Sequence, residues 1–311
     1  MIINPDTLAL TLAGIKTTFD AAYQKAQDNS QWSKVADVLP TTLPVQTYAW
    51  LGHSALMQAY VDEAQEQDIS QYTYTVTDAT WKALERIDRR TIEDDQYGLI
   101  MRHATNLANE PMRHWNYLVF TALVNGFSST CYDGKNFFAN NHSEGLSGTQ
   151  SNTVSTTLND ANLEIAEAAM MAFVDDKGIP MGITPDTLVV GPKLARRAWN
   201  LVGQGIVVKP VGSDTAGTGA TASTPYGNYF QGRYNVVVSP YITNYNWFLL
   251  DTTRGLKPIF IQSRSDVPIS FETDMLTPDA MLRERFRIAV RGRYQLAYGM
   301  WQCAYGSSAS S

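Results

Sequence analysis

The strongest constraint in this sequence is a long helical pattern between residues 91 and 126. Apolar residues recur there at steps of three and four, as they do on one face of a helix, and Gly126 is placed to end it. The segment MRHATNL (101–107) recurs as MRHWNYL (112–118), an offset of eleven residues that is close to three whole turns. Such a helix spans about 50 Å at ~1.5 Å per residue, so much of the chain must pack along it. Its apolar stripe consists of Ile100, Ala104, Leu107, Pro111, Trp115, Leu118 and Ala122.

The chain before this pattern reads as one more helix followed by extended segments. Residues 6–27 repeat apolar side chains at helical spacing, which predicts an amphipathic helix that must lie on another element. Residues 32–52 hold two prolines and no sustained period, so we expect an extended arm. YTYTVT (72–77) alternates as strands do, and WKALERIDRR (81–90) follows it. We expect these two segments to form a projecting two-stranded loop, preceded by the acidic residues of 55–71.

The second half of the chain alternates helix and strand patterns, as a separate α/β lobe does. A helix is predicted from Asn159, and TPDTLVVGP (184–192) reads as a buried strand before a short helix at 193–203. Small polar residues at 212–228 predict a mobile loop on this lobe. Two more strands are predicted at 234–242 and 246–251.

The segment RERFRIAVRGRYQLAYG (283–299) predicts a strand with two unlike faces. Because successive side chains of a strand point to opposite sides, its apolar residues share one face and its arginines share the other. Like charges on one face repel unless carboxylates or phosphates meet them, so we expect a partner surface. In an acidic chain the expected partner is the carboxylates of a neighbouring copy, and a solvated edge is the alternative. The arginines are Arg283, Arg285, Arg287, Arg291 and Arg293.

Charge and cysteine content argue against several classes of protein. The net charge of -6 and the pI near 5.2 disfavour a general electrostatic grip on nucleic acid or on an anionic membrane. Two cysteines cannot form a disulfide framework, and their wide separation does not suit a structural zinc site. The longest apolar run, WNYLVFTALV, is about half of what a membrane-spanning helix needs. The N-terminus lacks the basic residues of a secretory signal, so we expect a soluble chain with no membrane contact.

The stretch CYDGKNFFANNHSEG (131–145) is the richest candidate for chemistry, because it gathers Cys131 and His142 with an aspartate, a lysine and a glutamate. Asp133 with Gly134 favours a tight turn, and the paired phenylalanines can anchor it. No third member of a catalytic triad is in view. We therefore expect a turn that leaves the long helix, followed by a surface loop of Asn, His and Ser residues.

Other candidate sites have simpler explanations. His103 and His114 share a helical face but should lie about 16 Å apart along the axis, too far to share one metal ion. The acidic run at 93–95 complements the dipole at a helix start. The sequence contains no HExxH, P-loop, dinucleotide fingerprint or G-x-S-x-G motif. We predict no catalytic, cofactor-binding or metal-binding residues, and no enzyme activity.

Four ordered blocks carry a resemblance to a known family: YAWLG (48–52), IEDDQYG (92–98), CYDGKNFFANNH (131–142) and WFLLDTTRGLKPIFIQ (247–262). Trp32 with VADVLP and the final GMWQCAYG extend it over nearly the whole length. Through these blocks the chain resembles the major head (capsid) subunit of Mu-like phages and prophages. The resemblance implies an α+β fold, the tailed-phage major capsid fold of the Hong Kong 97 type. That fold has an N-terminal arm, an E-loop, a peripheral (P) domain with a long spine helix, and an axial (A) domain.

On that resemblance the chain divides into six segments. They are the N-terminal arm (1–50), the E-loop (51–90), the P domain with its spine helix (91–157), the A domain (158–256), the return strands of the P domain (257–296), and the last A-domain strand with the tail (297–311). The acidic segment 55–71 lacks the basic and aromatic pattern expected at this place in the family, which leaves the contacts of the E-loop tip open.

The resemblance further implies a structural protein that self-assembles into pentamers and hexamers and closes an icosahedral phage head around double-stranded DNA. Its expected partners are other copies of itself, packaged DNA without sequence specificity, and scaffold, portal and decoration proteins, with no cofactor. Its expected location is the virion capsid, and the host cytoplasm during assembly. The alternatives are a hydrolase or nucleotide-binding enzyme built on the α/β lobe, and another phage component such as a tail or portal protein. From opposite local charge we expect subunit contacts at Arg86, Arg89, Arg90, Arg287, Arg291 and Arg293, facing Asp62, Glu63 and Glu66.

Overall fold

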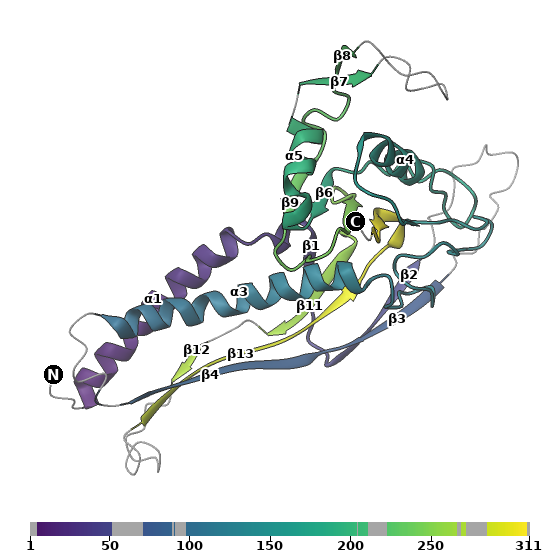
Figure 1. The fold of residues 1–311 in the computed structure, drawn as a ribbon. Coiled ribbons are helices and arrows are strands. Elements are labelled where there is room, and N and C mark those ends of the chain that lie inside the picture. The colour runs from purple at the N-terminus through teal and green to yellow at the C-terminus, as the bar shows by residue number, and fades with distance from the viewer. Residues whose placement is uncertain are drawn as a thin grey trace, which may run out of the picture.

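The computed structural model has an elongated half, in which two long helices follow a long sheet, and a more compact half at one end of it (Figure 1). It describes residues 5–51, 71–88, 90, 98–203, 205–210, 223–265, 269–271 and 285–309 of the 311-residue chain.

The predicted long helix is confirmed as α3 (Leu99–Asn125). It begins after Gly98, whose φ of 65° is in the left-handed region, and it ends at Gly126, whose N–H donates to the carbonyl of Leu123. The residues 91–97, where the sequence predicts its first turn, lie outside the described part of the chain. The predicted stripe is buried at Ala104, Leu107, Pro111, Trp115 and Ala122.

The predicted N-terminal helix is confirmed as α1 (Pro5–Asp28), which packs along α3 (Figure 1). Ile15 and Phe19 are buried in that contact. A short 3-10 helix, η1 (Trp32–Lys34), follows it. The ring of Trp32 meets the ring of Trp115 edge-on, with 4.9 Å between centroids, so the chain after α1 is fixed against the middle of α3.

The long sheet is organised around β13 (Arg285–Tyr298). β4 (Ala79–Asp88) pairs antiparallel with one edge of β13, and β12 (Ile269–Phe271) and β11 (Ile259–Ser265) pair antiparallel with the other edge. β1 (Ala36–Pro40) extends the sheet by pairing in parallel with β11. The predicted extended arm is therefore extended, but part of it is a strand in the sheet of its own chain.

The expectation that the strands at 72–77 and 81–90 pair with each other is wrong. β3 (Gln71–Thr77) pairs with β2 (Val45–Leu51) as a two-stranded ribbon, whereas β4 pairs with β13. The long sheet supplies contacts that an isolated ribbon does not, because the ring of Trp81 on β4 stacks on Tyr294 of β13 and packs against His114 of α3.

The compact half confirms the predicted α/β lobe. Its sheet has the order β5 (Thr153–Val154), β14 (Ala304–Ser307), β10 (Trp247–Leu250), β6 (Thr187–Val190) and β9 (Asn235–Val238). Its helices are α4 (Asp160–Met171), η2 (Pro192–Leu194) and α5 (Ala195–Gly203). The C-terminal strand β14, which follows η3 (Trp301–Cys303), joins this sheet beside β10.

A second two-stranded ribbon projects from the compact half (Figure 1). It consists of β7 (Ile206–Pro210) and β8 (Ser223–Gly227), which pair antiparallel. Most of the predicted mobile loop at 212–228 lies outside the described residues.

One buried hydrophobic core runs from α1 and α3 into the compact half. Phe138, just after α3, links the two parts, because its ring lies against both Gly126 and Gly306 of β14. A Cβ added at either glycine would come within 2.8 Å of a ring carbon of Phe138. The two halves therefore fit together closely at the end of α3.

Candidate functional site

The strands β4 and β13 place basic side chains on the sheet face opposite the one that packs on α3. Lys82 lies directly opposite Arg291, and Arg86 lies directly opposite Arg287. All four residues are exposed. We call these four residues the basic stripe.

The basic stripe puts like charges in directly paired positions, which destabilises an antiparallel strand pair. Leu84 lies opposite Ala289 between the two cationic pairs and is 55% exposed. The two pairs are four positions apart along each strand, which is about 13 Å at ~3.3 Å per residue. The surface therefore favours a partner that brings carboxylates or phosphates about this far apart, with a small apolar group between them.

The structure brings together three of the predicted contact residues, Arg86, Arg287 and Arg291. Sequence reasoning missed Lys82, although the alternation of exposed Thr80, Lys82, Leu84 and Arg86 along β4 was a signal that could have found it. Arg90 is described and exposed. Arg89, Asp62, Glu63 and Glu66 lie outside the described residues, so their predicted contacts remain predictions.

Among the described arginines of the predicted ladder, Arg285 and Arg293 each lie beside a carboxylate of their own chain. Nε of Arg293 lies 3.1 Å from Oδ2 of Asp78, and Nε of Arg285 lies 3.3 Å from Oδ1 of Asp88. Arg293 accordingly has a structural role within the subunit, which the prediction of a contact with a neighbour did not include.

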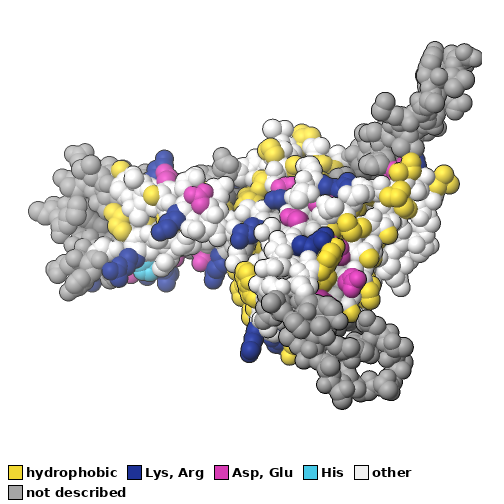
Figure 2. Space-filling view, turned by 90° about the horizontal axis from the view of Figure 1, so that it is seen from above, with side chains coloured by type: hydrophobic (Ala, Val, Ile, Leu, Met, Phe, Trp, Pro, Cys, Tyr) yellow, Lys and Arg dark blue, Asp and Glu magenta, His cyan; other side chains and the backbone are white. Residues whose placement is uncertain are grey.

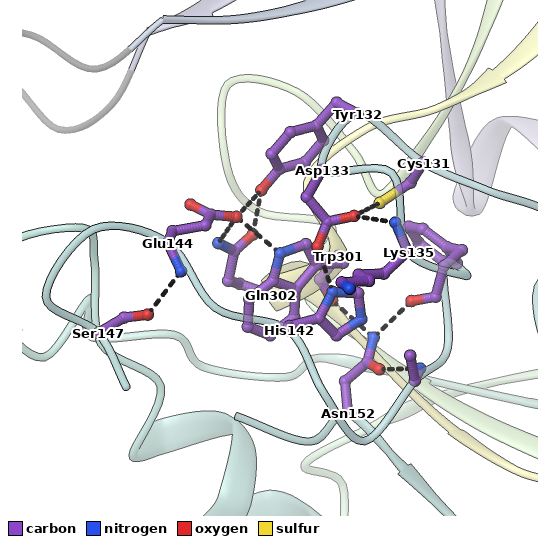
Figure 3. Close-up of polar contacts among 12 residues, drawn as sticks. Cys131, Tyr132, Asp133, Lys135, His142, Glu144, Ser147, Asn152, Trp301 and Gln302 are labelled. Carbon is purple, nitrogen blue, oxygen red and sulfur yellow. Dashed lines mark hydrogen bonds and ion pairs between the residues drawn. The ribbon is translucent and has the colours of Figure 1, made fainter. Parts of the chain in front are cut away.

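The candidate stretch at 131–145 forms a polar cluster under the C-terminal residues (Figure 3). Sγ of Cys131 donates to Oδ1 of Asp133 over 3.1 Å, and Nδ1 of His142 lies 2.6 Å from Oδ2 of the same carboxylate. The His142 ring also stacks on Trp301, with 4.1 Å between centroids. We call Cys131, Tyr132, Asp133, His142, Glu144, Trp301 and Gln302 the junction cluster.

The electrostatics of the junction cluster oppose nucleophilic chemistry. Burial, reinforced by the charge of Asp133, raises the pKa of the Cys131 thiol well above its usual value. The thiol therefore stays protonated, and a thiolate is the form that attacks. Burial raises the pKa of Asp133, but hydrogen bonds from His142 and from the Lys135 N–H outweigh this and leave that pKa below its usual value.

Glu144 is the centre of the other part of the junction cluster (Figure 3). Its Oε1 accepts from the Tyr132 hydroxyl at 2.6 Å, from Nε1 of Trp301 at 2.8 Å and from Nε2 of Gln302 at 3.2 Å. Burial, followed by the charge of Glu144, raises the pKa of Tyr132 well above its usual value. These bonds join the segment after α3 to η3, so the cluster holds distant parts of the chain together.

The predicted turn after the long helix is confirmed, because Gly134 has a φ of 75° and Phe137 and Phe138 are buried. The predicted surface loop is wrong for His142 and Glu144, which are buried beneath Trp301 and Gln302. Local sequence carries no sign of this, since the covering residues lie about 160 positions away. Neighbouring Asn140, Asn141 and Ser143 are exposed as expected.

The other candidates for chemistry are His103 and His114, both on α3. His103 is exposed on α3. His114 packs against Trp81, and its Nδ1 lies 2.8 Å from the Tyr294 hydroxyl. Within the described part of the chain there is no group of three or more side chains able to hold a metal ion. None of the described helices is long and apolar enough to cross a membrane.

Seen from above, hydrophobic side chains lie on both halves, and on the compact half they are interspersed with basic and acidic side chains (Figure 2). Large examples in the second half of the chain are Ile165, Trp199 and Tyr229.

The sequence matches the family model described as Mu-like prophage major head subunit gpT over residues 8–157, 151–242 and 235–310. The chain belongs to this family. It is similar to the Mu-like prophage FluMu major head subunit of Haemophilus influenzae, with 24% identity over 305 residues that cover 97% of this chain and 73% of the relative. It is also similar to the major capsid protein of Escherichia phage Mu, with 20% identity over 304 residues that cover 98% and 74% of the two chains.

Solved structures show the same fold. The chain superposes on a subunit of the procapsid of bacteriophage JBD30 with a TM-score of 0.54 and 22% identity, covering 96% of this chain and 75% of that one. For the virus-like particle from Pyrococcus furiosus the TM-score is 0.57 with 11% identity, covering 95% and 98%. These likenesses confirm the predicted tailed-phage capsid fold of the Hong Kong 97 type.

Membership of the Mu-like head subunit family decides between the functions that the sequence left open. The chain is a structural component of the phage capsid that assembles with copies of itself. It is not an enzyme, so the alternative of a hydrolase or nucleotide-binding enzyme is wrong. Nor do the comparisons favour a tail or portal component.

Proposed function

We propose that this head subunit forms pentamers and hexamers that close an icosahedral phage head around double-stranded DNA. The observation that carries the proposal is the likeness of nearly the whole chain, 96% of its length, to a procapsid subunit. Tailed-phage heads of this fold are closed shells, and a symmetric shell repeats the same contacts around every subunit.

We assign the parts of the chain to the parts of that fold as follows. α3 is the spine helix of the P domain, and the sheet that contains β6, β10 and β14 is the A domain. Residues 1–50 are the N-terminal arm, and the E-loop begins at residue 51. The pairing of β4 with β13 supports an E-loop that ends near residue 77 instead of residue 90.

We further propose that the basic stripe binds carboxylates of a neighbouring subunit. The supporting observation is charge: two directly opposed cationic pairs are exposed on a chain whose net charge is -6. Residues 62–66 read DEAQE, in which Asp62, Ala64 and Glu66 have the same two-residue spacing as Lys82, Leu84 and Arg86. A segment with that spacing, when extended, presents two carboxylates about 13 Å apart with a small apolar group between them.

The test is assembly of charge-reversed subunits, followed by sedimentation across a range of salt. The double variant Arg86→Glu and Arg291→Glu should lose most assembly. Lys16→Glu with Lys25→Glu is the matched control, because it changes the net charge equally at exposed positions on α1 and should assemble as the wild type does. Adding Asp62→Arg and Glu66→Arg to the first variant should restore assembly. Wild-type assembly should also weaken as salt is raised, because dissolved ions screen exposed charge pairs. The Debye length is about 10 Å at 0.1 M and shortens as the salt concentration rises.

Two results would contradict parts of this proposal. If reversal at Arg86 and Arg291 leaves both assembly and its salt dependence unchanged, the basic stripe does not bind a neighbouring subunit. If assembly is lost but the second pair of reversals does not restore it, a different acidic group binds the stripe.

We propose the remaining partners from the function of a head. Scaffold, portal and decoration proteins bind the assembling or finished shell, packaged DNA meets its inner surface without sequence specificity, and assembly takes place in the host cytoplasm. The JBD30 capsid has been solved decorated with minor capsid protein trimers. Co-sedimentation of purified shells with candidate phage proteins tests each of these interactions.

A further inference from the structure

The β2–β3 ribbon joins the long sheet at two places, which we call its roots. The first root is the turn at residues 41–44, between β1 and β2, and the second is Asp78, between β3 and β4. The two roots are adjacent, because the N–H of Asp78 donates to the carbonyl of Pro44 over 2.9 Å. The direction of the ribbon is therefore set by what holds these few residues against the long sheet.

A β-bulge lies beside both roots. The register of β11 against β13 shifts between Ser263 and Ser265, so Arg264 is the extra residue. A bulge disrupts the ladder locally and points the side chain of the extra residue in a new direction.

The guanidinium of Arg264 reaches both roots at once. Its Nε donates to the carbonyl of Thr42 over 3.2 Å, and its Nη1 donates to Oδ2 of Asp78 over 3.3 Å. A forked, planar guanidinium can make two such bonds in fixed directions, which a single ammonium group cannot. Arg264 thus ties both ends of the ribbon to one point of the long sheet.

A second cation completes this arrangement. Nε of Arg293 lies 3.1 Å from the same Oδ2 of Asp78, whose side chain is only 6% exposed. A carboxylate taken out of water in this way requires its cations, and the loss of one partner leaves the others uncompensated. Arg264 supplies the directional restraint through its hydrogen bond to Asp78, whereas Arg293 adds charge to the pair without hydrogen-bond geometry at its Nε.

The ribbon also makes apolar contacts, and Tyr74 of β3 packs against both the main core and a smaller cluster. Val76, Phe260 and Ala297 form a hydrophobic cluster of their own beside the main core. Tyr48 adds an edge-on contact to Phe260 at 5.1 Å and a hydrogen bond to Gln262 of 3.1 Å. A cluster of this size can anchor the ribbon while still allowing it to tilt, because packing contacts are not directional.

We infer that Asp78, Arg264 and Arg293 form an ionic latch that sets the direction of the β2–β3 ribbon relative to the long sheet. Its role is positioning: the latch orients the β2–β3 ribbon for contact with a neighbouring subunit. This role rests on the proposed self-assembly, whereas the latch itself is a property of the single chain.

Hydrogen exchange on the full-length chain, kept below its assembly concentration, tests the latch directly. Asp78→Asn keeps the shape of the side chain but removes its charge. It should raise the exchange of the β2 and β3 amides by about tenfold, as expected when a mostly buried ion pair is broken and a local segment opens. Exchange in β1, β6 and β10 should not change. Asp88→Asn is the matched control, because it breaks the exposed pair with Arg285 on the same two strands, β4 and β13, and should leave the ribbon unchanged.

A second variant covers the case in which Asp78→Asn does not fold. Arg264→Lys keeps the charge but can bind only one root, so it should raise ribbon exchange by a smaller factor. Unchanged ribbon exchange in both variants would overturn the latch. Assembly of the same variants, followed by sedimentation, then tests positioning. Faster ribbon exchange with undiminished assembly would overturn the positioning role, whereas failure of the wild type to assemble would count against the proposed function alone.

Discussion

Replacing Glu144 by alanine is the most informative single change in the junction cluster. Oε1 of this carboxylate accepts three hydrogen bonds, from Tyr132, Trp301 and Gln302, in a region that is almost fully buried. The first donor belongs to the turn after α3 and the other two belong to η3. Glu144→Ala therefore removes two of the hydrogen bonds that connect segments about 160 residues apart, those from Trp301 and Gln302.

The size of the effect follows from the donors left without an acceptor. The Tyr132 hydroxyl can turn to Oε1 of Gln302, which lies 3.1 Å away, so it keeps a partner. Nε1 of Trp301 and Nε2 of Gln302 each lose their bond to Glu144. A buried donor without a partner costs about 1–3 kcal/mol, and removing the buried carboxylate offsets part of the sum. We expect a loss of about 3 kcal/mol in the free energy of unfolding.

Urea denaturation of the unassembled chain measures this loss. Glu110→Ala is the control, because Glu110 pairs with Arg113 on the exposed side of α3 and should contribute less than about 0.5 kcal/mol. Glu144→Gln, which keeps an acceptor oxygen, should fall between the two. A cost for Glu144→Ala no larger than that of Glu110→Ala would refute the view that the cluster joins the two segments.

Two further predictions concern the same region. Because the pKa of Asp133 is lowered in the folded chain, its carboxylate stabilises the fold above its unfolded pKa of about 4, and this contribution is lost as the pH falls through the folded pKa. Stability should therefore fall more steeply with acidification in the wild type than in Asp133→Asn, and equal slopes in urea titrations at several pH values would contradict this. Gly306→Ala would place a methyl within 2.8 Å of the Phe138 ring and should cost about 1–3 kcal/mol, whereas Gly203→Ala, with nothing within 4 Å, should not destabilise. Equal melting temperatures for these two glycine variants would rule out the close fit at Phe138.

Local sequence patterns are sufficient to predict which side chains are buried when the spacing of apolar residues within one helix or strand determines its buried face. The stripe of α3 is an example, because helical spacing alone places Ala104, Leu107 and Trp115 on one face. The alternation in β13 is another, since strand geometry places Ile288 and Val290 on one face and the flanking Arg287 and Arg291 on the other. Local patterns do not contain the position of the last strand, β14, which returns to the sheet of the compact half beside β10.

Features that depend on contacts between residues far apart in the sequence cannot be predicted from local patterns. Asp78 reads as a simple break between two strands, and only the bulge at Arg264 and the nearby Arg293 reveal its role. His142 reads as part of a polar loop, and its burial depends on Trp301. β4 was assigned to a hairpin because adjacent strands often pair, whereas its apolar face is satisfied by β13 and α3.

Negative-stain electron microscopy of the purified full-length chain tests the central claim most directly. A head subunit with these contact surfaces should form capsomer rings or closed shells, more of them at low salt than at high salt, and the Arg86→Glu and Arg291→Glu variant should form few. Particles that stay single subunits at every concentration and salt, for the wild type as for the variant, would contradict the account.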